Sequence, residues 1–253
     1  MKKLYLLFLF ISFSLVVSAQ GELIEEEDEI FYENERTYAV TVRTNGWGVD
    51  YRYGRRIDGY RKRLFSFEFA TLKHPRELRI SNFYGLSNDR FVYGKLNNIY
   101  TLKGSYGFQK EMYGKRDKNG LSIRYFYLLG ATVSIIKPIY YEINYNTYIK
   151  TERFNYNLHQ PYNIVGTASF LKGINEIKFS PGVFAKYGYS FEFGKKIDRV
   201  NALDLGLMVE GYLLPIKILG VDDSNRNLID DNNHLFFALF FSYRFGKIID
   251  AYE

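Results

Sequence analysis

The sequence predicts an all-β fold, an eight-stranded antiparallel transmembrane β-barrel that follows an export signal. Among 253 residues there are 24 Tyr and 22 Phe but only 5 Pro, and aromatic residues are enriched in β-strands. The N-terminus has the composition of a signal peptide. Eight later segments alternate apolar residues with small, polar or charged ones. A period of two indicates strands whose two faces meet different surroundings.

Residues 1–19 are expected to be a signal peptide. Lys2 and Lys3 form a basic start, residues 4–17 are apolar, and Val17-Ser18-Ala19 reads as a small-residue cleavage site. The alternative is a transmembrane anchor, which the short apolar run and the acidic segment after it disfavour. The sequence contains no Cys, which excludes disulfides, thiolate metal sites and a lipoprotein anchor.

Three further regions are expected after the signal. Residues 20–35 are interpreted as an acidic periplasmic segment, because residues 21–35 hold eight acidic residues and no basic one. The outer-membrane barrel is expected over residues 36–247, and a short periplasmic tail over residues 248–253.

The first four predicted strands each have one apolar, aromatic-rich face. They are expected over residues 37–44, 47–54, 65–70 and 100–109. In the third, Phe65, Phe67 and Phe69 alternate with Ser66, Glu68 and Ala70. Asn45-Gly46 lies between the first two strands and is the strongest short hairpin signal.

The last four predicted strands are longer and repeat the pattern. They are expected over residues 121–135, 183–193, 203–210 and 235–246. In the final strand the odd positions are all apolar or aromatic, and the even positions include Ser242 and Arg244. We therefore expect Phe237, Leu239, Phe241 and Phe245 to face lipid and Arg244 to point into the barrel.

The connections predict the topology. Those after the second, fourth and sixth strands are short and basic, with twelve basic and four acidic residues in all. Those after the third, fifth and seventh strands are long, spanning about residues 73–95, 136–178 and 214–233. If the first strand runs outward, the short connections are periplasmic and the long ones extracellular, as in bacterial outer-membrane barrels.

The charged mid-strand residues predict an ion-paired interior. Those on the inward faces are Arg43, Asp50, Arg52, Glu68, Lys103, Arg124, Lys186, Glu192, Asp204, Glu210 and Arg244. An eight-stranded barrel is just wide enough to be filled by side chains, and enclosed charges must be paired. We expect a closed network of ion pairs; the alternatives are a proton or ion path through it, and a soluble β-sandwich instead of a barrel.

No catalytic residue, metal site or cofactor is predicted, and an enzyme is disfavoured. Some small barrels modify lipid A with Ser, His and an acid, and His74 with Ser81 or His234 with Ser242 is the nearest combination here. His159 completes the three histidines, all expected as solvated residues at the outer rim. Four aspartates in the last long connection, Asp222, Asp223, Asp230 and Asp231, match no metal motif.

Several stretches carry a resemblance to a known group of proteins. They include VVSAQ, RTNGWGVDYRYGRR, LKHPRE, YGKLNNIY, IKPIYYEI, FLKGINEIKFSPGVFAKYGYSFEFG and FSYRFGK. The chain resembles uncharacterised small outer-membrane β-barrel proteins of Bacteroidota. The resemblance implies a barrel in the outer membrane of a Gram-negative cell and supplies no catalytic motif.

The expected role is therefore structural or scaffolding, or that of a small subunit of an envelope assembly. The alternatives are a lipid-A-modifying enzyme and a narrow transporter or lipid-binding barrel. The expected partners are outer-membrane lipid and a periplasmic or outer-membrane protein, and no nucleic acid. Basic turns and an acidic N-terminal segment suit electrostatic contact with such a protein.

Overall fold

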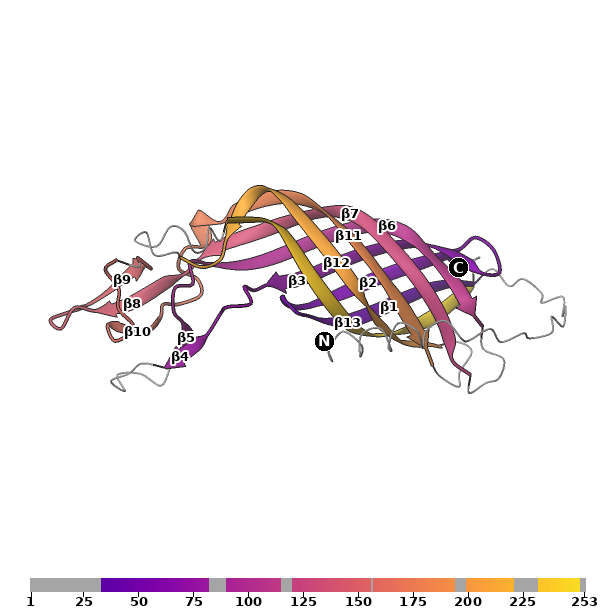
Figure 1. Cartoon of the computed structure of the whole chain (residues 1–253), viewed down its shortest axis with the longest axis horizontal. Helices are drawn as coiled ribbons and strands as arrows, with labels where there is room; N and C mark the ends of the chain where they lie inside the picture. Colours follow the sequence, from indigo (N-terminus) through magenta and orange to yellow (C-terminus); the bar gives the residue numbers. More distant parts are fainter. Residues whose placement is uncertain are drawn as a thin grey trace, which may run out of the picture. The chain divides into compact units, whose positions relative to one another are not determined.

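Eight antiparallel strands close into a barrel, which confirms the predicted fold class and strand count. The computed structural model describes residues 33–81, 90–114, 120–155, 157–193, 199–220 and 232–250. The barrel order is β1-β13-β12-β11-β7-β6-β3-β2, so the first and last strands pair (Figure 1). Its strands are β1 (Glu33–Arg43), β2 (Gly46–Arg56), β3 (Arg61–Leu72), β6 (Asn97–Tyr113), β7 (Ser122–Pro138), β11 (Lys178–Glu192), β12 (Arg199–Lys217) and β13 (Asn232–Asp250).

Both predicted ends of the barrel need correction. Glu33 pairs with Asp250 across β1 and β13, so residues 33–35 belong to the barrel and not to the acidic segment. Residues 248–250, predicted as tail, continue β13. The reason is that a ladder of backbone hydrogen bonds extends as far as both strands supply partners. Residues 1–32 and 251–253, with the predicted signal peptide, lie outside the described residues.

The long connections contain structure that the sequence analysis missed. β4 (Arg79–Ser81) pairs with β5 (Arg90–Val92), and β8 (Tyr140–Asn144) lies between β9 (Ile149–Arg153) and β10 (Ile164–Thr167). The 3-10 helix η2 (Ile174–Glu176) precedes β11. Strands of three to five residues are too short for alternation to reveal them. We call the end of the barrel with these connections the loop end and the opposite end the turn end.

Among the described residues, no helix has both the length and the apolar character needed to cross a membrane.

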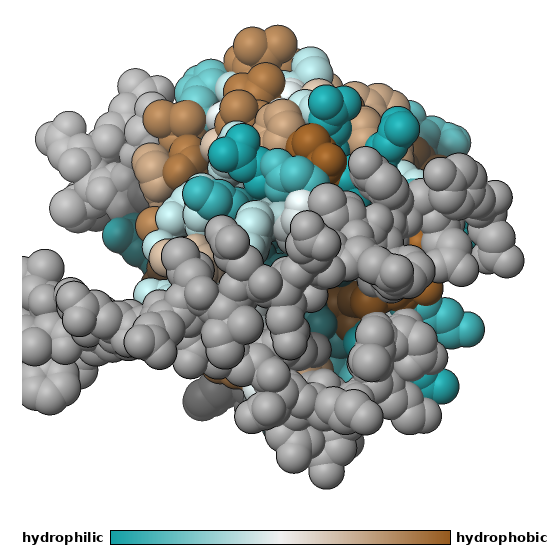
Figure 2. All heavy atoms as spheres, turned by 90° about the vertical axis from the view of Figure 1, so that its right-hand side faces the viewer, coloured by the Kyte–Doolittle hydropathy of each residue, from teal (hydrophilic) through white to brown (hydrophobic). Residues whose placement is uncertain are grey.

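The two faces of the barrel strands differ as the alternation predicts. Phe237 is 71% exposed and Phe67 68%, and Leu239, Phe241 and Phe245 are exposed as well. The inward face carries the buried charges described below. Figure 2, seen from the turn end, shows hydrophobic side chains along the flank and hydrophilic ones gathered at the end. An apolar surface of this extent on a closed barrel is typical of a wall that contacts lipid.

The first hairpin turns one residue earlier than predicted. Its turn residues are Thr44 and Asn45, because Gly46 already pairs with Arg43. Gly46 has φ +149°, a conformation that side chains disfavour. A Cβ there would also lie 2.1 Å from the Thr71 carbonyl oxygen. Gly46 therefore allows β2 to approach β3 closely. The predicted Asn45-Gly46 turn was wrong by one position.

Small residues on the inward face let neighbouring strands approach closely, and this yields a test. A Cβ at Gly206 would lie 2.0 Å from the Tyr187 carbonyl oxygen, whereas one at Gly104, on the outer face, would meet nothing closer than 3.7 Å. Gly206→Ala is expected to reduce the yield of folded barrel strongly, because the backbone of β11 must move. Gly104→Ala is the matched control and is expected to fold normally.

The measurement is the fraction of each variant that runs as folded, heat-modifiable protein in semi-native gel electrophoresis after refolding into detergent. Equal folded fractions for the two variants would show that the β11–β12 contact relaxes easily and would contradict the prediction.

Candidate functional site

The inward face of the barrel holds all eleven residues predicted for the interior. None is more than 9% exposed. They occupy three successive levels, which we name the outer cluster near the loop end, the middle cluster, and the inner cluster near the turn end. The barrel register sets these levels, since Arg43 lies at the end of β1 and Glu35 near its start.

The outer cluster joins Arg43, Lys103 and Lys186 to two carboxylates. The Glu210 Oε1 atom lies 2.9 Å from Arg43 Nη1 and 2.7 Å from Lys103 Nζ. Glu68 lies 3.5 Å from Arg43, 3.2 Å from Lys103 and 3.1 Å from Lys186. Glu68 is thus shared by three cations, and it is the one carboxylate of the described chain that pairs with Lys186.

The middle cluster is centred on Arg244. Its Nη2 lies 2.8 Å from Asp50 Oδ2 and its Nε 2.9 Å from Asp204 Oδ2. Its Nη1 donates to Thr37 Oγ1 at 3.1 Å. Arg52 approaches Asp204 to 3.5 Å. The guanidinium therefore donates one hydrogen bond to each of two carboxylates, and such charge-assisted bonds are stronger than bonds between neutral groups.

The inner cluster contains three residues that the sequence analysis did not place inside. Arg124 lies 2.6 Å from Glu192, 3.1 Å from Glu35 and 3.9 Å from Glu111. Lys62 also pairs with Glu35. The analysis assigned Glu35 to the acidic segment, and Lys62 and Glu111 to the basic connections. All three have the parity of the inward-facing residues on their strands. Continuing the alternating pattern past the predicted strand ends would therefore have identified them.

These additions balance the interior charge. The clusters hold three, two and two basic residues against two, two and three acidic ones, from the outer cluster to the inner. The six-to-five excess of basic residues in the predicted set disappears once Glu35, Lys62 and Glu111 are included. A neutral set of pairs limits the cost of burying so many charges.

Apolar side chains fill the space between the ions, and the sequence analysis did not anticipate their number. One buried group comprises Leu64, Phe126, Leu128, Phe184, Met208, Ala238 and Phe240. Arg52 stacks over Phe126 at 4.4 Å and Lys186 over Phe240 at 4.5 Å from the ring centroids. A second group packs at the loop end of the strands, namely Leu72, Ile99, Tyr212, Ile216 and Ile218. The interior is therefore packed rather than hollow at these levels.

The two small sheets at the loop end enclose a separate hydrophobic core, which we call the loop-end core. Phe91, Ile139, Tyr141, Ile143, Phe154 and Ile164 are buried together. The Tyr141 hydroxyl donates to the carbonyls of Val92 at 2.8 Å and Lys95 at 2.9 Å, which joins the two sheets. Burial raises the pKa of Tyr141 above its usual range. Backbone bonds from Leu96 to Ile218 and from Gly220 to Gly94 attach this core to the segment that directly follows β12.

Neither of the two serine–histidine combinations considered as an alternative is assembled among the described residues. Ser242 is fully buried and its hydroxyl lies 2.8 Å from that of Thr41. His234 is exposed, with Nδ1 3.1 Å from the Tyr212 carbonyl oxygen. At the loop end, His74 Nδ1 accepts from the Arg76 backbone N–H at 3.1 Å.

His159 corrects another expectation, because it is 1% exposed rather than solvated. Its Nδ1 accepts from the Asn155 backbone N–H at 3.1 Å, and its ring packs edge-on against Phe154. Apolar neighbours within the loop-end core exclude water from it. No group of three or more His, Asp or Glu able to hold a metal occurs in the described ranges. Asp222, Asp223, Asp230 and Asp231 lie outside them.

Comparisons with known proteins find remote similarity to solved structures. No protein-family model matches the chain, and no curated protein matches it. Ail of Yersinia pestis, solved with the heparin analogue sucrose octasulfate, aligns with 9% identity over 87% of this chain and 100% of its own, with a TM-score of 0.37. Neisserial surface protein A aligns with 7% identity over 85% and 96%, at 0.39. The N-terminal β-barrel domain of Pseudomonas aeruginosa OprF aligns with 8% identity over 87% and 98%, at 0.34. Similarity this remote says nothing of this chain's role.

Proposed function

We propose that this chain is an outer-membrane barrel with a closed, ion-paired interior and a structural or scaffolding role, as a small subunit of an envelope assembly. The observation that carries the proposal is the contrast between the two faces of one closed sheet. Outside are exposed residues such as Phe67 and Phe237, and inside are buried charges such as Glu68 and Arg244. A closed barrel satisfies its backbone hydrogen bonds internally, which a bilayer requires of any β structure that spans it.

The connections support an orientation with the turn end in the periplasm. Short turns lie there in bacterial outer-membrane barrels, and longer loops lie outside the cell. The basic residues that flank the β2–β3 turn, Arg55, Arg61 and Arg63, are exposed. They offer a positively charged surface to a periplasmic partner, whose attraction acts on encounter and specificity.

The packed interior favours scaffolding over transport. A transported ion or solute needs a continuous path, and the outer cluster, the aromatic side chains and the apolar group at the loop end occupy that path. Backbone bonds also join the loop-end core to the segment that follows β12, so the long connections are attached to the barrel. The bonding of Ser242 to Thr41 gives no support to a lipid-A-modifying enzyme.

Reconstitution of the full-length protein tests this proposal. We expect a heat-modifiable band in the outer-membrane fraction and no single-channel conductance in planar bilayers, because side chains fill the interior. Recovery as a soluble periplasmic monomer would disprove the membrane location. A stable open-channel current would disprove the closed interior.

Purification in mild detergent then tests the scaffolding role. A protein that co-purifies at constant stoichiometry and is lost when Arg55, Arg61 and Arg63 are replaced by Gln is the expected result. A barrel that purifies alone from cells at native abundance, with or without these substitutions, would argue against assembly.

A further inference from the structure

The segment that leads from β10 into β11 covers part of the outer face of the barrel at the loop end. Lys137 has the same parity on β7 as the exposed Val133, so its side chain points outward. It is nevertheless only 5% exposed. Its Nζ lies 4.5 Å from the centroid of the Phe170 ring and donates to the Lys172 carbonyl oxygen at 3.2 Å. Residues 168–177, which we call the rim segment, therefore pack against the outside of β7.

The strand β7 places this contact at the level where the hydrocarbon of a bilayer ends. A tilted barrel strand needs about 9–11 residues to cross the hydrocarbon. Every outward residue of β7 from Ile123 to Ile135 is apolar or aromatic, and this stretch is long enough to cross. Lys137 is the next outward residue and the first with a charge. The rim segment that covers it is therefore at the boundary between hydrocarbon and lipid head groups.

The rim segment carries exposed apolar side chains beside the outer wall. Phe170 is 59% exposed, Leu171 71% and Ile174 41%. Apolar side chains that are exposed together, unlike single ones, mark a contact surface. Phe179 on β11 pairs with Ile135 on β7 and is itself 62% exposed. The exposed side chains of the rim segment thus continue the apolar outer surface that β7 and β11 form.

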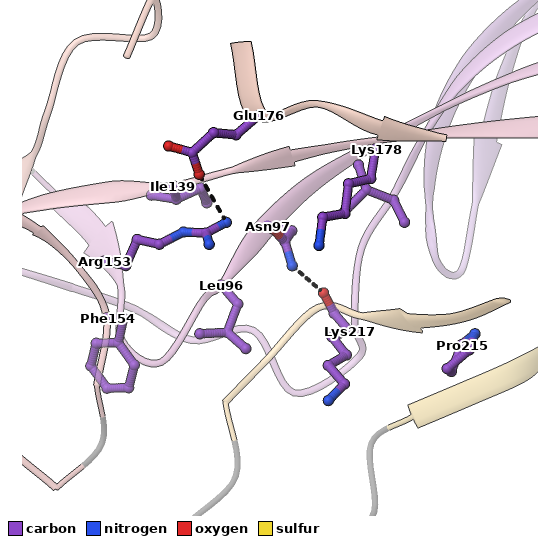
Figure 3. A pocket seen from close by; sticks show the side chains of 10 residues that line it. Leu96, Asn97, Ile139, Arg153, Phe154, Glu176, Lys178, Pro215 and Lys217 are labelled. Atoms are coloured by element: carbon purple, nitrogen blue, oxygen red, sulfur yellow. Dashed lines mark hydrogen bonds and ion pairs between the residues drawn. The ribbon is translucent and has the colours of Figure 1, made fainter. Parts of the chain in front are cut away.

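Several contacts hold the rim segment in one position. Glu176 accepts a hydrogen bond from the Tyr140 hydroxyl, and its Oε2 lies 3.6 Å from Arg153 Nη2 on β9 (Figure 3). The Ala168 N–H donates to the Tyr140 carbonyl oxygen at 2.9 Å. Gly173 has φ +81°, and a Cβ there would lie 2.9 Å from the Tyr140 ring. A surface that is already ordered loses little conformational entropy when it binds a partner.

We propose that the rim segment inserts Phe170, Leu171 and Ile174 into the outer leaflet beside the barrel. The inference rests on the proposed outer-membrane location. The partner is a lipid surface, because the inserted residues continue the lipid-facing wall at the level of the head groups. Tyr140 belongs to β8 and Arg153 to β9, so their contacts with the segment attach the sheet β10-β8-β9 to the membrane surface.

Nitroxide labels on single cysteines test this depth, and because the chain contains no Cys each variant carries one label. Leu171→Cys reports on the rim segment and Phe179→Cys on the barrel wall. Ile149→Cys is the aqueous control, since Ile149 is 60% exposed at the opposite end of β9 from Arg153. The full-length variants are inserted into vesicles of phosphatidylethanolamine and phosphatidylglycerol. The measured quantity is the ratio of each label's collision rates with oxygen, which concentrates in hydrocarbon, and with a water-soluble nickel chelate.

We expect the ratio of oxygen to chelate collisions at Leu171 to be several-fold higher than at Ile149 and to approach that at Phe179. Equal ratios at Leu171 and Ile149 would place the rim segment in water and overturn the inference. A label at Leu171 shielded from both reagents would also overturn it, because these residues would then contact protein, such as a second copy of the chain.

The label at Phe179 separates this inference from the proposed function. A high ratio at Phe179 with a low ratio at Leu171 refutes insertion of the rim segment alone. A low ratio at both positions means that the barrel is not in the bilayer, which refutes the proposed function. Heat-modifiable migration of each labelled variant shows that the barrel under measurement is folded.

Discussion

Replacing Arg244 with leucine is expected to destabilise the barrel by about 3–5 kcal/mol, the usual cost of removing one partner of a buried ion pair. Arg244 contacts Asp50 at 2.8 Å and Asp204 at 2.9 Å. After the substitution Asp50 keeps no ion-pair partner among the described residues, and Asp204 keeps Arg52 at 3.5 Å. Both carboxylates are at most 4% exposed, so water cannot take the place of the guanidinium.

Urea unfolding of the protein in lipid vesicles provides the measurement, and Phe241→Leu is the control. Phe241 lies three positions away on the same strand but faces outward, 49% exposed. Exchanging one apolar side chain for another against lipid is expected to cost less than about 1.5 kcal/mol. A larger loss for Phe241→Leu than for Arg244→Leu would mean that the faces of β13 are reversed, since strand parity assigns every residue of the strand together.

Replacing Glu68 with glutamine is expected to have an effect of similar size, about 3–5 kcal/mol. Glu68 lies within 3.5 Å of Arg43, Lys103 and Lys186. Glutamine keeps the shape and removes the charge, which leaves Glu210 as the carboxylate for three buried cations. The substitution affects Lys186 most, because it loses its ion-pair partner and keeps only the cation–π contact with the ring of Phe240 among its described contacts. A cation–π contact offsets only part of the lost attraction.

A double-mutant cycle isolates this effect from general disruption of the interior. Lys186→Gln removes the cation that Glu68→Gln leaves unpaired. The double variant Glu68→Gln/Lys186→Gln is therefore expected to unfold at higher urea than Glu68→Gln alone. Additive losses in the two single variants would show that Glu68 and Lys186 are not coupled, and the description of the outer cluster would then be wrong.

The sequence alone was sufficient to predict the barrel. Alternation with a period of two depends on each strand by itself, so eight strands and their faces are readable without knowing which strands are neighbours. The long final segment shows this well: Phe237, Leu239 and Phe241 are exposed and Arg244 is buried, as parity required. The alternation weakens at strand ends, and this is where the boundaries failed, at Glu35, Lys62 and Glu111.

Only the tertiary structure decided which charges pair, how the interior is filled and what the long connections form. Arg43 and Glu210 are 167 residues apart and Arg244 and Asp50 are 194 apart, so no spacing in the sequence predicts their contact. They meet because strand register around the closed barrel brings them to one level. The loop-end core likewise depends on Phe91, Tyr141 and Ile164 from separate short strands.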